Sequence, residues 1–103
     1  MNKLKWADAM FAAAHGQYGP RWIRAAAILQ EGTLWEGARH CDIIASIVAA
    51  GTVRRVKGEQ GFVTNKGEFL DRKAAAQLAL SNGQLTDKEF NRARLFSEEL
   101  WSP

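Results

Sequence analysis

The sequence predicts a small α+β domain in which short antiparallel β-hairpins pack against three to four helices. Two observations lead to this prediction. The chain has 103 residues, of which 47% are hydrophobic and 24% charged, and this suits one compact core and leaves no room for two. Stretches with helical spacing of apolar residues also alternate with stretches that carry hairpin signals. We divide the chain into an N-terminal helical extension, residues 1–20, and a single α+β domain, residues 21–103.

The first third of the chain predicts a helix followed by a hairpin. Apolar residues recur every three or four positions from Leu4 to Ala14, which predicts a helix that ends by about residue 15. The stretch from Trp22 to Leu29 alternates weakly, Glu31-Gly32 supplies a turn, and an extended pattern resumes after it. These signals predict a β-hairpin, and the alanine-rich run 24–28 keeps a helix open as the alternative.

The middle of the chain predicts a second helix and a second hairpin. Between Gly37 and Gly51 the apolar residues again fall at helical spacing, and Gly51 suits the left-handed position that ends a helix. Residues 58–70 place extended segments on either side of Asn65-Lys66-Gly67, a short loop that tolerates a positive φ. We therefore expect a hairpin here.

Two more helices are predicted near the C-terminus. Asp71 can accept hydrogen bonds from the free N–H groups of the turn that follows it, and Asn82-Gly83 supplies a stop signal, so residues 72–82 should form a helix. Thr86 and Glu89 have the spacing of a capping box. This predicts a last helix that runs through about Phe96.

The charge of the chain bears on its partners. The net charge of +3 comes from 14 basic and 11 acidic residues that are interspersed. Proteins that bind duplex DNA usually show a denser basic stripe, whereas a few well-placed arginines are enough for a small phosphate ligand. The composition therefore permits a small anionic ligand and does not favour a nucleic-acid polymer.

Cysteine and hydropathy patterns point to the cytoplasm. The single Cys41 cannot form an intrachain disulfide, and with His15 and His40 it lacks the ligand count and spacing of a zinc site. The longest apolar stretches are too short to span a bilayer, and the N-terminus has no signal-peptide pattern. We expect a cytoplasmic protein, without a metal and without a membrane partner.

The sequence favours binding over catalysis. A Walker-type phosphate loop, a nucleophile elbow and paired histidines on a helix are missing from it, so we expect no enzyme activity and no cofactor. Four Trp, five Phe and one Tyr exceed what a core of this size buries. Some aromatic side chains should therefore lie at a ligand site or at a subunit interface, and we expect a dimer or a larger homo-oligomer.

Several residues suit a compact phosphorylated ligand, and each has a simpler structural explanation. Phe62, beside the second hairpin loop, could stack on a base or belong to the core. Lys88 and Arg92, four residues apart on the last predicted helix, could hold a phosphate or form a solvated face. Arg39 and His40 start the second predicted helix, where free N–H groups favour an anion; the alternative is a surface arginine and a partly buried histidine.

Two polar residues complete the candidate site. Asn65 is most simply a turn former and Asp71 most simply a helix cap. Either side chain could also bond a ribose hydroxyl.

Five separated blocks of the chain, taken in order, carry a family resemblance: GARHCDII at 37–44, GEQGFVT at 58–64, FLDRKAA at 69–75, GQ at 83–84 and LFSEELW at 95–101. Together they resemble the phage Thoeris anti-defence sponge family, whose first members sequester the immune signal made by TIR enzymes. The resemblance implies a non-enzymatic α+β protein that binds cyclic ADP-ribose isomers intact in pockets between protomers. Some members form hexamers and take up cyclic di- or trinucleotides at separate sites. Residues 1–20 have no counterpart in the family.

The resemblance also assigns residues. Phe62 matches the family's base-stacking aromatic, and Asp71 falls near a polar ribose contact. Lys88 and Arg92 fall where the family places two basic residues on a helix. Lys88 stands where an arginine is expected, and an ammonium group cannot grip a phosphate in the bidentate manner of a guanidinium. Arg39-His40 is assigned to the cyclic oligonucleotide site.

Two other functions stay open. One is a phage regulatory or nucleic-acid-binding module, which the positive charge and the aromatic residues favour and the missing basic stripe does not. The other is a protein inhibitor that contacts a host defence enzyme directly, which surface tryptophans would suit equally well.

Overall fold

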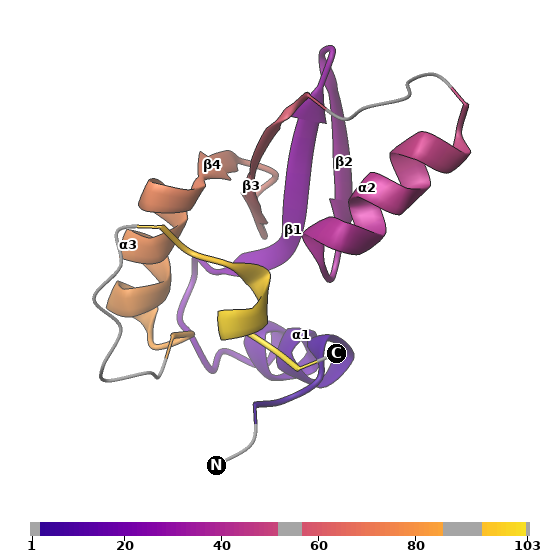
Figure 1. Ribbon diagram of the computed structural model, residues 1–103. Helices are drawn as coiled ribbons and strands as arrows, with labels where there is room; N and C mark the ends of the chain where they lie inside the picture. Colours follow the sequence, from indigo (N-terminus) through magenta and orange to yellow (C-terminus); the bar gives the residue numbers. More distant parts are fainter. Residues whose placement is uncertain (1–2, 52–56, 86–93, 103) are drawn as a thin grey trace.

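A four-stranded antiparallel sheet with strand order β2-β1-β3-β4 forms the centre of the protein (Figure 1). The computed structural model describes residues 3–51, 57–85 and 94–102. The predicted α+β class is confirmed. The elements in chain order are α1 (Trp6–Ala14), β1 (Ile23–Gln30), β2 (Thr33–Gly37), α2 (His40–Ala49), β3 (Glu59–Thr64), β4 (Phe69–Asp71), α3 (Arg72–Asn82) and the 3₁₀ turn η1 (Ser97–Glu99).

Both predicted hairpins are present, and the alanine-rich run forms a strand and not a helix. β1 pairs with β2 on one side and with β3 on the other. Ala26 lies opposite Gly37 in β2 and opposite Phe62 in β3. Small residues at this central position leave room for the large ring of Phe62, so packing across the sheet overrides the helical propensity of alanine.

The main core lies between one face of the sheet and the helices. α2 contributes Ile43 and Ile47, α3 contributes alanines, and the C-terminal segment contributes Trp101, which is 1% exposed. A smaller cluster on the other face joins Ala25, Ala27 and Val63 to the partly buried Leu34 and Phe69.

Two glycines of the GEQG block are required by close packing. A Cβ atom at Gly61 would overlap the carbonyl oxygen of Leu70 on the adjacent strand β4. At Gly58 a Cβ atom would lie 2.5 Å from the carbonyl oxygen of Leu29. This block is therefore a structural element at which neighbouring backbone atoms approach closely.

The signals that begin α3 and that end α2 and α3 act as predicted. The Oδ1 atom of Asp71 accepts a hydrogen bond from the Ala74 N–H at 2.7 Å, and Gly83 has the left-handed conformation that ends α3. Gly51, just beyond α2, is also left-handed, with φ of 75°. In both places glycine meets a positive φ without the steric cost of a Cβ atom.

The prediction of a helix through about Phe96 is wrong for its last residues. Residues 86–93 lie outside the described part of the chain, and residues 94–96 are not helical. The Leu95 N–H donates to the Arg72 carbonyl oxygen at 3.0 Å, and the Leu95 carbonyl accepts from the Arg72 guanidinium at 2.7 Å. These two bonds to α3 occupy the N–H and C=O groups of Leu95, which a helix would use for its own hydrogen bonds.

The N-terminal helix packs on the rest of the chain. Ala9 joins the main core, and the indole N–H of Trp6 donates to the Arg24 carbonyl oxygen at 2.8 Å. The backbone of Leu4 accepts a bond from the Ser102 N–H at 2.9 Å, so the two ends of the described chain lie together (Figure 1). Among the described residues, no helix is long and apolar enough to cross a membrane.

Candidate functional site

A cavity of about 720 Å³ opens where the start of β3, the β4–α3 junction and the C-terminal segment meet. Its size falls within the range of about 300–1,000 Å³ that is typical of small-molecule sites. Its walls carry three basic side chains, two carboxylates and one aromatic ring. The lining residues are Gly58, Glu59, Gln60, Asp71, Arg72, Lys73, Arg94 and Phe96.

Arg72 is the most strongly held cation of the cavity. It is only 7% exposed, and its Nη1 and Nη2 atoms donate to the Leu95 carbonyl oxygen at 2.7 Å and to the Gln60 Oε1 atom at 2.6 Å. Its Cζ atom lies 4.6 Å from the centre of the Phe96 ring, in cation–π contact. The guanidinium is therefore held between β3 and the C-terminal segment.

The charge of the cavity favours an anion. Burial, and then the positive charge of Arg94, lower the pKa of Arg72, although a guanidinium stays protonated at neutral pH. Lys73 and Arg94 are exposed at the same cavity. A bound phosphate would relieve the repulsion between these cations and accept charge-assisted hydrogen bonds from them.

The two carboxylates of the cavity differ in their roles. Asp71 already caps α3 through its Oδ1 atom. Glu59 is exposed at the first residue of β3. A carboxylate beside three cations can accept hydrogen bonds from hydroxyl groups such as those of a ribose.

The structure places Phe62 in the core, where no base can stack on it. The side chain is 0% exposed, and its ring meets the His40 ring edge to face with centroids 5.1 Å apart. β3 is buried on both faces at this point, and Phe62 is not among the residues that line the cavity. The aromatic ring at the cavity is Phe96, which the sequence analysis did not select.

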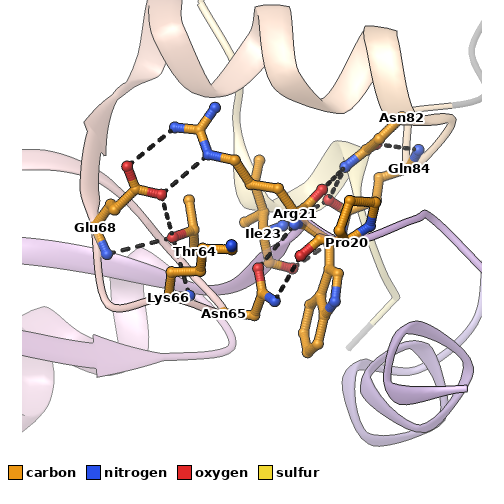
Figure 2. A network of polar contacts seen from close by, with 10 residues as sticks. Pro20, Arg21, Ile23, Thr64, Asn65, Lys66, Glu68, Asn82 and Gln84 are labelled. Carbon is orange, nitrogen blue, oxygen red and sulfur yellow. Dashed lines mark hydrogen bonds and ion pairs between the residues drawn. The ribbon is translucent and has the colours of Figure 1, made fainter. Parts of the chain in front are cut away.

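Asn65 is part of a polar network that joins the second hairpin loop to the start of β1 (Figure 2). Its Oδ1 atom accepts from the Trp22 N–H at 2.9 Å, and its Nδ2 atom donates to the Pro20 carbonyl oxygen at 3.1 Å. An ion pair of 3.0 Å between Arg21 and Glu68 lies in the same network. Both ends of the Asn65 amide are engaged within the chain, so its observed role is structural.

The same network explains the GQ block. The Gln84 side chain accepts from the Ile23 N–H at 2.6 Å and donates to the Ile23 carbonyl oxygen at 2.9 Å (Figure 2). Its amide thus bonds to β1 as a neighbouring strand would. Asn82 donates to the Arg21 carbonyl oxygen at 3.1 Å and joins the end of α3 to this site.

Arg39 and His40 lie at the start of α2 and contact the C-terminal segment. Arg39 Nη2 donates to the Trp101 carbonyl oxygen at 2.8 Å. His40 Nε2 lies 2.7 Å from the Gly61 carbonyl oxygen, and burial lowers the pKa of His40. Neither residue lines the cavity that holds Arg72. Of the sequence candidates, the structure brings only Asp71 to this cavity, and Lys88 and Arg92 lie outside the described residues.

Sequence reasoning missed five side chains that line this site: Glu59, Gln60, Lys73, Arg94 and Phe96. It also missed Arg72 as a binding residue. One signal was available, because two consecutive basic residues directly follow the helix cap Asp71, and the start of a helix favours anions. The contribution of Arg94 and Phe96 depends on long-range contacts that local patterns do not show.

A second cavity, of about 460 Å³, lies between α1 and the sheet. Trp6, Met10 and Trp22 are among its lining residues, and Arg24 and Glu36 form an ion pair of 3.0 Å beside them. Phe11 on α1 is 68% exposed. This region offers apolar surface, whereas the first cavity offers cations.

The family of the chain follows from its sequence as a whole. The family model of the phage T4 y16D protein matches residues 21–101, which include both hairpins, α2, α3 and every residue that lines the cationic cavity. The chain belongs to this phage protein family. α1 lies outside the matched residues. No curated protein and no solved structure matches the chain.

Proposed function

We propose that this phage protein is a non-catalytic sponge that binds a small phosphorylated nucleotide and holds it unchanged. The proposed ligands are the cyclic nucleotide signals of host immunity, above all the cyclic ADP-ribose isomers made by TIR enzymes. Membership of a phage family agrees with such a role. The choice of ligand rests on the resemblance of the five sequence blocks to the Thoeris anti-defence sponge family.

The observation that carries the proposal is the convergence of Arg72, Lys73 and Arg94 on one cavity beside the ring of Phe96. Two phosphates of a cyclic dinucleotide can each accept charge-assisted hydrogen bonds there, worth about 1.5–3 kcal/mol apiece. The ring supplies an apolar surface for a base or a sugar.

The carboxylates of the cavity argue against a nucleic-acid polymer. Glu59 and Asp71 lie among the three cations, so the net charge of the lining is close to +1. A duplex backbone requires a continuous basic surface, and carboxylates on that surface would repel it. A single nucleotide with ribose hydroxyls can use both kinds of charge.

The resemblance adds Lys88 and Arg92 as phosphate contacts, and a site shared between protomers. Both are predictions, and so is the assembly into a dimer or a hexamer. They can be tested beside the cavity because the two pairs of cations, Lys73 with Arg94 and Lys88 with Arg92, can be removed separately.

Calorimetric titration with cyclic ADP-ribose tests the proposal. The wild-type protein should bind with a sub-micromolar Kd and release unchanged ligand on heat denaturation. The double variant Lys73→Ala, Arg94→Ala should bind about two to four orders of magnitude more weakly, because two charge-assisted contacts are lost. A matched control, Lys5→Ala with Lys66→Ala, removes the same charge elsewhere and should leave the affinity unchanged.

Three results would contradict parts of the proposal. Recovery of linear ADP-ribose as the main product would mean turnover and would exclude a sponge. A loss of binding only in the Lys88/Arg92 double variant would move the site away from the cavity described above. If the Lys5/Lys66 control lowers the affinity equally, the binding depends on non-specific charge and not on the cavity.

A second candidate function is direct inhibition of a host defence protein. The observation that favours it is the exposed apolar surface of the N-terminal region, where Phe11 is 68% and Leu4 49% exposed. Such residues are typical of protein contacts. Phe11→Ser would then abolish anti-defence activity and leave nucleotide binding intact, which a sponge does not predict.

A further inference from the structure

The C-terminal strap, residues 94–102, supplies one wall of the cationic cavity. Two of its residues, Arg94 and Phe96, line the cavity, while Leu95 and Ser97 are 0% and 1% exposed. The strap has little regular structure beyond the 3₁₀ turn η1, so bonds to other elements must hold its position. Those bonds come from two sides.

The first anchor is Arg72 on α3. Its guanidinium donates to the Leu95 carbonyl oxygen at 2.7 Å, and its own carbonyl oxygen accepts from the Leu95 N–H at 3.0 Å. These bonds pin the residue between Arg94 and Phe96. They do not restrain the strap beyond Phe96.

The second anchor is Arg39, at the N-terminal end of α2. Its side chain is 12% exposed, and Nη2 donates to the Trp101 carbonyl oxygen at 2.8 Å. Nη1 lies 3.8 Å from a carboxylate oxygen of Glu98. The Trp101 indole N–H returns a bond to the Ala38 carbonyl oxygen at 2.7 Å. The far end of the strap is thereby closed onto α2.

His40 connects the strap to the sheet. A carbonyl oxygen can only accept, so His40 Nε2 must carry the proton of its 2.7 Å bond to Gly61. In the neutral ring Nδ1 is then an acceptor, and it faces the Ser97 hydroxyl at 3.4 Å. Gly61 directly follows Gln60, which holds Arg72. One imidazole therefore ties the strap to the strand that forms the opposite wall.

We propose that Arg39 and His40 are positioning residues for the cationic cavity: they hold the strap so that Arg94 and Phe96 stay at its wall. The inference rests on the proposed function of this cavity and replaces the assignment of Arg39 and His40 to a ligand of their own. It implies that a ligand spanning α3 and the strap tightens the docking of the strap, because coupling between two sites is reciprocal.

Two kinds of measurement test this role on the full chain. Amide hydrogen exchange of the ligand-free protein reports the docking of the strap, and Arg39→Ala should speed exchange at Leu95 and Trp101 by about tenfold while amides in the middle of α3 keep their protection. Titration with cyclic ADP-ribose and with inorganic pyrophosphate reports the cavity. Arg39→Ala should weaken both by about tenfold, and the salt dependence of binding should become shallower because Arg94 no longer contributes fully.

Milder variants keep the test valid if Arg39→Ala folds poorly. Trp101→Phe keeps an aromatic ring, removes the bond to Ala38 and leaves part of the buried indole volume unfilled. It should show the same two effects in smaller size. Arg39→Lys keeps the positive charge and one donor nitrogen, and should restore part of the affinity. Arg21→Ala breaks an exposed ion pair outside the strap and should change neither readout.

The outcomes separate the inference from the proposed function. Faster exchange in the strap with unchanged affinity would overturn the positioning role and leave the sponge standing. Unchanged exchange at Leu95 and Trp101 would overturn it as well. If the wild-type protein binds neither probe, the proposed function is wrong, and the exchange data alone decide whether Arg39 holds the strap.

Discussion

Replacing Arg72 by methionine tests whether this side chain, which lines the cavity, also stabilises the folded protein. Methionine keeps most of the apolar length of arginine but removes the charge and all five N–H donors. In the structure it would leave the Leu95 carbonyl oxygen and the Gln60 Oε1 atom without the donors that now lie 2.7 Å and 2.6 Å away. It would also remove the contact with the Phe96 ring.

The expected loss follows from these contacts. Two hydrogen bonds from a charged donor contribute about 1.5–3 kcal/mol each, and the cation–π contact adds about 0.5–1 kcal/mol. Removing the buried cation returns part of this, because a guanidinium that is 7% exposed has lost most of its hydration. We therefore expect Arg72→Met to lower the free energy of unfolding by about 2–3 kcal/mol, which lowers Tm by roughly 10–20 °C in a domain of this size.

Lys73→Met is the matched control, because Lys73 lines the same cavity but is exposed. It should change the free energy of unfolding by less than about 0.5 kcal/mol and still weaken nucleotide binding. Thermal and urea unfolding followed by circular dichroism, together with calorimetric titration, measure both properties. If Arg72→Met unfolds within about 2 °C of the wild-type protein, Arg72 does not hold the strap and the energetic argument above is wrong.

Three further predictions test other parts of the fold. Gly61→Ala should destabilise the protein by more than about 3 kcal/mol, seen as loss of soluble protein or of the unfolding transition, because its Cβ atom would overlap the Leu70 carbonyl. Burial lowers the pKa of His40, so the unfolded chain takes up a proton from about pH 6.5 downward while the folded chain resists it. Stability should therefore be complete above that pH and fall as the pH falls further, with a smaller fall in His40→Gln, as urea midpoints between pH 7.5 and 5.5 would show. Asn65→Ala should cost about 1–2 kcal/mol by removing its bonds to Trp22 and Pro20, with unchanged affinity for cyclic ADP-ribose; a lower affinity without lower stability would instead support a ribose contact.

The parts of the fold that were predicted correctly depend on local chemistry. Asp71 caps α3, and Gly83 ends it, because both act on backbone groups within a few residues of themselves. The second hairpin follows from its turn residues in the same way. These signals do not depend on what the rest of the chain does.

The parts that could not be predicted depend on contacts between distant segments. Whether Phe62 faces a ligand or the core is decided by Ala26 across the sheet and by His40 from α2. The cavity itself combines residues 58–60, 71–73, Arg94 and Phe96. Spacing along the chain carries no information about such contacts. For this reason the sequence pointed to Phe62, which is buried, and not to Phe96, which lines the cavity.

The same geometry changes what the five resembling blocks mean. The block at 37–44 meets the block at 95–101 through the bond of Arg39 to Trp101 and the contact of His40 with Ser97. The block at 58–64 meets the block at 69–75 through the β3–β4 pairing and through Gln60 and Arg72. Blocks that contact each other in this way maintain the fold. A shared fold does not by itself imply a shared ligand.

The choice of ligand must therefore depend on the exposed cations at the cavity. Arg72 is engaged by Gln60 and Leu95, whereas Lys73 and Arg94 are exposed at the cavity. Variants of partly buried residues such as Arg39 change the fold and the site together, and cannot distinguish a sponge from another binder. Exchanging the exposed Lys73 and Arg94 for glutamine removes two positive charges from the cavity. If the stability of the protein is unchanged, a loss of affinity shows that the anion binds there. This pair of substitutions is the sharpest test of function that the structure offers.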